Sequence, residues 1–190
     1  MKTVLEELFK LPDCLLIIKP HPRQDVELVK SYLNDFPKDR WVISNMNTFT
    51  LATLSDFTVS FWSSAITDSL AMGIPAIEYY KYDTNFYQTL VDEDNRIVSF
   101  YTKLNFALRA NTEEELSSAI KLVVSEYDFV KSKQLKAFND VFCDRLDSKE
   151  RIYNFLQEQI ISKNYINKKR MSVSTLYDFV RITFWSQKNK

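Results

Sequence analysis

The sequence predicts an α/β protein whose doubly wound parallel sheet is followed by C-terminal helices. Two observations support this fold class over the first two-thirds of the 190 residues. Short, wholly apolar runs, as expected of strands covered on both faces, alternate with segments that have helical spacing. Strands separated by helices pair in parallel through right-handed crossovers. After residue 110 only helical patterns follow, and the chain is long enough for one domain with a helical appendage.

The expected elements follow from local patterns. Apolar runs predict four strands, with residues 96–100 as a possible fifth; the four are residues 14–19, 40–44, 56–61 and 74–80. Helical spacing predicts intervening helices at residues 2–10, 25–33, 48–54 and 64–72. Pro12 stops the first helix, and Gly73 follows the last one at the position that favours a left-handed residue.

The C-terminal third is expected to be helical throughout. "NTEEEL" predicts a helix start, with a capping box between Thr112 and Glu115. Further helices are expected at 128–144 and 147–162, and the tail could add a last one. The core face of the 147–162 helix is predicted to carry Ile152, Phe155, Leu156 and Ile160. The simplest division is a nucleotide-binding domain at 1–127 and a helical extension packed on it at 128–190.

Composition excludes several kinds of function. Lysine plus arginine equals aspartate plus glutamate at 25 each, so the net charge favours neither nucleic acid nor an acidic partner. Gly73 is the only glycine, where roughly a dozen would be average, so no glycine-rich phosphate loop exists. Cys14 and Cys143 are expected to be reduced core residues of a cytoplasmic protein, and no spacing indicates a metal site.

The only histidine, His21, follows the first predicted strand and lies between two prolines. Ligands of open parallel sheets bind at the carboxyl ends of the strands. Pro20 and Pro22, which flank His21, stiffen the loop. The imidazole therefore loses little conformational entropy when it binds a ligand. Beside Lys19 and Arg23, His21 is suited to donate a hydrogen bond to a phosphate oxygen. The alternative is a strand-ending turn with an exposed histidine.

A serine pair follows the third predicted strand, at the start of a helix. Ser63 and Ser64 offer hydroxyls beside unpaired backbone N–H groups, which suits an anion. The alternative is plain helix capping. Asp68 lies one turn later, where it could reach a ribose hydroxyl or remain a solvated surface acid. Glu78 and Tyr80, at the end of the fourth strand, are weaker candidates for contacts with a bound donor.

These segments together resemble a known family. "LIIKPHP" and "SDFTVSFWSSAITDSLAMGIPAIEYY" are similar to the donor-binding, carboxyl-terminal half of GT-B glycosyltransferases. The likeness is strongest to bacterial enzymes of capsule, polysialic-acid and teichoic-acid synthesis, and it covers residues 1–160. It implies that His21 and Pro22 match the family's HP motif and that Ser63 and Ser64 match its serine pair. Asp68 falls where similar epimerases carry a ribose-binding acid.

The resemblance implies a metal-independent transferase that uses a CMP-, CDP- or UDP-linked donor and no other cofactor. The unit transferred would be a glycosyl or alditol-phosphate group, and His21 and the serine pair would stabilise charge on the departing phosphate. The acceptor site would belong to an amino-terminal domain that this chain lacks, so the chain would be a Rossmann-like half of a GT-B fold. Two alternatives remain, namely half of a nucleotide-sugar 2-epimerase and a non-catalytic remnant or interaction module.

The basic and aromatic tail, residues 168–185, raises one further expectation. Such a mixture suits an anionic membrane surface, so peripheral contact with the inner face of the plasma membrane is one interpretation. Packing of the tail on the missing amino-terminal domain is the favoured alternative.

Overall fold

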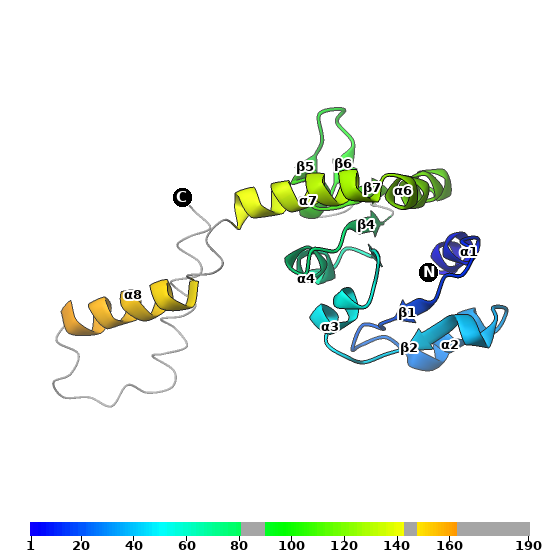
Figure 1. Cartoon of the computed structure of the whole chain (residues 1–190), viewed down its shortest axis with the longest axis horizontal. Coiled ribbons are helices and arrows are strands. Elements are labelled where there is room, and N and C mark those ends of the chain that lie inside the picture. Colours follow the sequence, from blue (N-terminus) through cyan, green and yellow to red (C-terminus); the bar gives the residue numbers. More distant parts are fainter. Residues whose placement is uncertain (81–89, 143–147, 163–190) are drawn as a thin grey trace. The chain divides into compact units, whose positions relative to one another are not determined.

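The computed structural model describes residues 1–80, 90–142 and 148–162, and it confirms the α/β fold class (Figure 1). Parallel strands are flanked by helices, as in Rossmann-like doubly wound folds. The chain forms two compact units, residues 1–143 and 144–190. The boundary between these units follows the helix at 127–141, whereas the expected division lay at 127/128. That division into a donor domain and an extension stays a prediction.

The four expected strands are confirmed, each shorter than the apolar run that predicted it. One parallel pair consists of β1 (Leu16–Ile18) and β2 (Trp41–Ile43). A second parallel sheet has the order β3-β4-β7, with β3 at Thr58–Ser60, β4 at Ala76–Tyr79 and β7 at Leu108–Ala110. All the strands that carry predicted site residues at their carboxyl ends are therefore parallel strands.

The possible fifth strand at 96–100 is wrong as a member of the parallel sheet. Residues Ile97–Val98 form β6, which pairs antiparallel with β5 (Leu90–Val91). The Asp92 carboxylate closes this hairpin by accepting hydrogen bonds from the N–H groups of Asp94 and Arg96, at 3.0 and 2.9 Å. The place beside β4 is taken by β7, whose single apolar–charged–apolar triplet gave too short a signal to be recognised.

Eight helices and one short 3-10 turn connect these strands in the described ranges. They are α1 (Lys2–Phe9), α2 (Val26–Leu33), η1 (Lys38–Arg40), α3 (Thr48–Thr53), α4 (Ala65–Ala71), α5 (Phe100–Lys103), α6 (Glu113–Ser125), α7 (Tyr127–Val141) and α8 (Ser148–Ser162). Gly73 has the expected left-handed conformation, with φ +78°. The N–H of Gly73 donates to Leu70 and that of Ile74 to Ser69, so the end of α4 is a Schellman motif.

The start of α6 differs from the expected capping box in one contact. Thr112 Oγ1 accepts a hydrogen bond from the N–H of Glu115, as expected. The Glu115 carboxylate accepts from the N–H of Asn111 at 2.6 Å rather than from that of Thr112. Two backbone donors are still satisfied, so the sequence signal located the helix start correctly.

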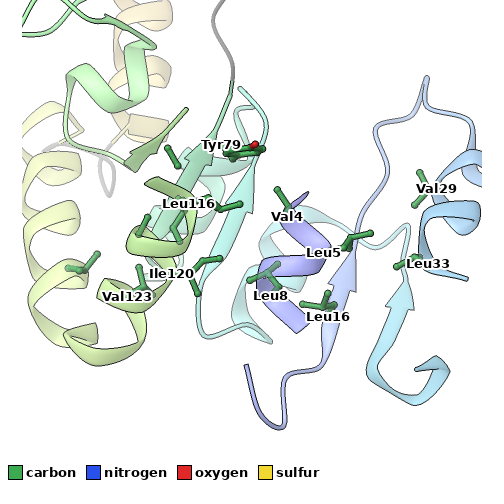
Figure 2. Packing of buried hydrophobic residues seen from close by; sticks show 14 residues of the cluster. Val4, Leu5, Leu8, Leu16, Val29, Leu33, Tyr79, Leu116, Ile120 and Val123 are labelled. Carbon is green, nitrogen blue, oxygen red and sulfur yellow. The ribbon is translucent and has the colours of Figure 1, made fainter. Parts of the chain in front are cut away.

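Both sheets contribute to one apolar cluster (Figure 2). On one side, Val4, Leu5 and Leu8 of α1 pack with Leu16 of β1. On the other side, the buried stripe of α6 packs with β4, and this stripe comprises Leu116, Ala119, Ile120 and Val123. The cluster thus joins α1 and α6 to strands β1, β4 and β7.

The predicted core face of the last described helix is not buried. Ile152 is 55% and Phe155 42% exposed, and Leu156 is half-buried. Helix α8 is the whole described part of the second unit, so within that part no second apolar element covers it. The side chain of Ile160 and the tail helix lie outside the described residues. Among the helices that are described, none has the length and hydropathy needed to cross a membrane.

Candidate functional site

His21 is exposed in a tight turn after β1, and local hydrogen bonds orient its ring. The N–H of Arg23 donates to His21 Nδ1 at 3.2 Å. The N–H of Gln24 donates to the carbonyl of His21 at 2.8 Å. Because Nδ1 accepts, the neutral imidazole must carry its proton on Nε2. The turn thus presents an Nε2–H donor at the carboxyl end of β1, beside the exposed Lys19 and Pro22.

The serine pair lies in the turn between β3 and α4. Ser63 Oγ accepts a hydrogen bond from the N–H of Ala65 at 3.2 Å. Ser64 is the N-cap residue, but its own hydroxyl makes no capping hydrogen bond. The capping alternative therefore applies to Ser63 and does not account for Ser64.

The ends of β3 and β4 lie side by side. Ser60 pairs directly with Glu78 in the parallel ladder. Beyond this pair, the ring centroids of Phe61 and Tyr79 are 6.2 Å apart, and those of Trp62 and Tyr80 are 5.9 Å apart. The serine turn and the end of β4 therefore belong to one local site.

Glu78 lies inside this site rather than on its surface. Its side chain is only 1% exposed, and Ser99 Oγ donates a hydrogen bond to Glu78 Oε2. Ser99 also caps α5 by accepting from the N–H groups of Tyr101 and Thr102, at 3.0 and 3.1 Å. The β5–β6 hairpin and α5 thus hold the carboxylate that the sequence placed among the donor contacts.

Asp68 lies on the first turn of α4, half-buried and close to α3. Burial raises the pKa of its carboxyl, and a hydrogen bond with the Thr48 side chain lowers the pKa in part. The pKa of Tyr101 is raised as well, first by burial and then by the negative charges of Glu78 and Asp68. These three ionisable groups therefore share one polar neighbourhood beside the serine turn.

The predicted residues fall into two groups. Lys19, His21 and Pro22 follow the β1–β2 sheet, whereas the serine pair, Asp68 and Glu78 belong to the three-stranded sheet. In the part of the chain that the structure describes, no hydrogen bond or ion pair links His21 to Ser63 or Ser64. Within the same residues no three His, Cys, Asp or Glu side chains gather as metal ligands do.

A small hollow of about 80 Å³ lies elsewhere, between β7, α6 and α7. Its lining includes Leu108, Leu122, Phe129 and Lys133, and none of the predicted site residues. This hollow therefore does not coincide with the candidate site.

Sequence reasoning missed three residues of this site. Ser99 lay in the segment expected as a possible fifth strand, although serine is also a preferred N-cap residue at a helix start. Tyr101 enters the site only through the packing of α5. Trp62 has a left-handed backbone, with φ +45°, which no sequence pattern indicates for a bulky residue.

Comparison with known proteins identifies the family to which the chain is similar. A search of the curated proteins gives no match. A family model described as CDP-Glycerol:Poly(glycerophosphate) glycerophosphotransferase matches residues 5–158, a span that contains every predicted site residue. The chain therefore belongs to the CDP-glycerol:poly(glycerophosphate) glycerophosphotransferase family.

Proposed function

We propose that this chain is the donor-binding half of a GT-B-type transferase that moves an alditol-phosphate unit from CDP-glycerol to a growing surface polymer. The observation that carries the proposal is the orientation of His21 within a chain of this family. The backbone N–H of Arg23 occupies Nδ1, so the ring offers Nε2–H to a ligand at the sheet edge. A diphosphate is the part of the donor that accepts such a bond.

In this proposal, residues from two strand ends bind the diphosphate. Lys19 and the His21 Nε2–H would contact phosphate oxygens from the β1 side. The Ser64 hydroxyl would do so from the β3 side, because it is not used for capping. Asp68 would accept hydrogen bonds from ribose hydroxyls, and Glu78 would fix the end of β4. Each of these roles is a prediction from the residue's chemistry and place.

Transfer would form a bond between an acceptor hydroxyl oxygen and the phosphorus that bears glycerol. The bond from that phosphorus to the bridging oxygen would break, and CMP would leave. Negative charge then develops on the departing phosphate, where the His21 Nε2–H and the serine hydroxyl would stabilise it. The residue that takes the acceptor's proton would belong to an acceptor-binding domain that pairs with this half.

The strand pairing leaves two edges of the parallel sheets open in the described part of the chain. Among the described strands, β1 pairs only with β2 and β3 pairs only with β4, so each keeps one open edge. A common doubly wound order, 3-2-1-4-5-6, places the first strand between the second and the fourth. The present strands correspond to strands 2 to 6 of that order, and the place of strand 1 is unfilled among the described strands. We propose that a strand from another polypeptide segment pairs with β1 and β3.

Binding of nucleotides tests the proposed function directly. Isothermal titration of the chain with CMP, CDP and UDP should show preference for the cytidine nucleotides. Loss of one charge-assisted hydrogen bond costs about 1.5–3 kcal/mol, so His21→Ala and Ser64→Ala should each weaken CDP binding roughly ten- to 150-fold. Ser31→Ala, on the exposed face of α2, is the matched control and should bind like the native chain.

Two further histidine variants make this test specific. Glutamine reproduces the Nε2 donor, whereas asparagine reproduces only the Nδ1 acceptor that Arg23 uses. His21→Gln should therefore retain more CDP affinity than His21→Asn. Equal loss in both, or no binding of any nucleotide by a chain that circular dichroism shows to be folded, would contradict the proposal.

Peripheral contact with the cytoplasmic face of the membrane stays a prediction based on residues 168–185, which lie outside the described ranges. Sedimentation with vesicles tests it. Binding that requires anionic lipid would support the contact, and equal sedimentation with neutral vesicles would contradict it.

A further inference from the structure

The turn between β3 and α4 holds an exposed tryptophan in an unfavourable backbone conformation. Trp62 has φ +45° and is 44% exposed. For a bulky side chain, the left-handed region costs about 1–3 kcal/mol and persists only where the surrounding structure imposes it. Burial of an aromatic ring in the core usually offsets such a backbone cost, yet much of the Trp62 side chain remains at the surface. The position therefore calls for an explanation other than core packing.

A second aromatic ring lies beside it. The centroids of Trp62 and Tyr80 are 5.9 Å apart, with the ring planes inclined by 44°. Tyr80 follows β4, and Trp62 follows its neighbour β3, so both rings lie at the carboxyl edge of one sheet. We call this pair the aromatic shelf. Trp62 directly precedes Ser63 in the chain.

We propose that the aromatic shelf stacks the cytosine base of the nucleotide donor. This inference rests on the proposed function and names the part of the donor that the residues bind. Of the components of CDP-glycerol, the diphosphate is charged, and the ribose and glycerol are polyols. Only the base has a π-face, which aromatic side chains bind by stacking. The shelf would then hold the base, while the serine turn beside it contacts the phosphates.

The test compares ligands that carry the base with one that lacks it. Isothermal titration would use CDP, cytidine and inorganic pyrophosphate with the native chain, Trp62→Ala and Trp62→Phe. Stacking contributes about 1–3 kcal/mol per base, so Trp62→Ala should weaken CDP and cytidine roughly 5- to 150-fold. Pyrophosphate binding should be unchanged, and Trp62→Phe should retain most of the affinity. Phe129→Ala, an exposed aromatic of α7, is the control and should bind as the native chain does.

Fluorescence gives a second readout on the same samples. Trp62 is one of three tryptophans, and a stacked base should quench its emission. In Trp62→Phe the quenching by CDP should disappear while binding persists.

The outcomes separate the two proposals. Native CDP binding that Trp62→Ala leaves unchanged would overturn the shelf and leave the proposed function standing. An equal loss of pyrophosphate and CDP would also overturn the shelf, because it would show disruption of the serine turn. Failure of the folded native chain to bind any nucleotide would overturn both.

Discussion

Gln134 joins α7 to the start of β4, and its replacement by leucine should destabilise the chain. The side chain is 2% exposed. Its Oε1 accepts a hydrogen bond from the N–H of Ala76 at 2.8 Å, and its Nε2 donates to the Ala76 carbonyl at 2.9 Å. The neighbouring strand β7 pairs with β4 only from Ile77 onward. The amide of Gln134 therefore takes the place of a strand at this point.

The expected cost follows from those two bonds. Gln134→Leu has similar volume but leaves the N–H and the carbonyl of Ala76 buried without these partners. Each unsatisfied buried group costs about 1–3 kcal/mol, and the added apolar burial offsets about 1.5 kcal/mol. A net loss of about 0.5–4.5 kcal/mol is expected, against the 5–15 kcal/mol typical of a domain.

Urea unfolding monitored by circular dichroism measures this loss. The midpoint should fall for Gln134→Leu, while Lys136→Leu on the exposed face of the same helix should stay within about 0.5 kcal/mol. Equal midpoints for the two variants would refute the view that this amide secures β4.

A charged variant at the same position adds a pH test. In Gln134→Glu, burial beside the Ala76 carbonyl raises the pKa of the introduced carboxyl, so the folded state retains a proton that the unfolded state releases. Stability should be highest at low pH and fall as pH rises through the raised pKa. A flat profile would contradict this geometry.

Three further predictions concern the frame and the site. Gly73→Ala should cost about 1–2 kcal/mol in urea unfolding, because φ is +78° while the nearest atom to an added Cβ, Lys131 Cε, is 4.0 Å away; a larger cost would mean a steric clash instead. Burial raises the pKa of Asp68, so folding favours its protonated form and stability is lost as pH rises through that pKa. Asp68→Asn should therefore melt higher than the native chain near pH 7, with the difference shrinking toward pH 4, and a constant difference in melting scans would argue against the burial. Arg40 donates to three backbone carbonyls around the end of α1, so Arg40→Ala should lower the urea midpoint by an amount equivalent to about 2–4 kcal/mol, whereas an unchanged midpoint would show that water replaces those bonds.

Local signals predicted most of the frame correctly. The apolar runs before His21 and before the serine pair are strands, as their short apolar pattern predicted. Gly73 ends α4 as expected, because the left-handed conformation after a helix is a local requirement that glycine meets. The same logic failed for residues 96–100, where a turn at Asp92 folds the run back into a hairpin. Whether a strand forms a hairpin or joins a parallel sheet depends on which strand it pairs with. A single apolar run does not specify that partner.

The candidate site, like the fold, could be predicted from the sequence only in part. The sequence by itself determined the order of strands and helices and the residue types at their ends, because these depend on periodicity, capping and turn chemistry over a few residues. Only the tertiary structure decided the rest. It buried Glu78 against Ser99 and brought Trp62 beside Tyr80. Those features depend on the register between strands and on side-chain direction, which are fixed by contacts between residues distant in the chain.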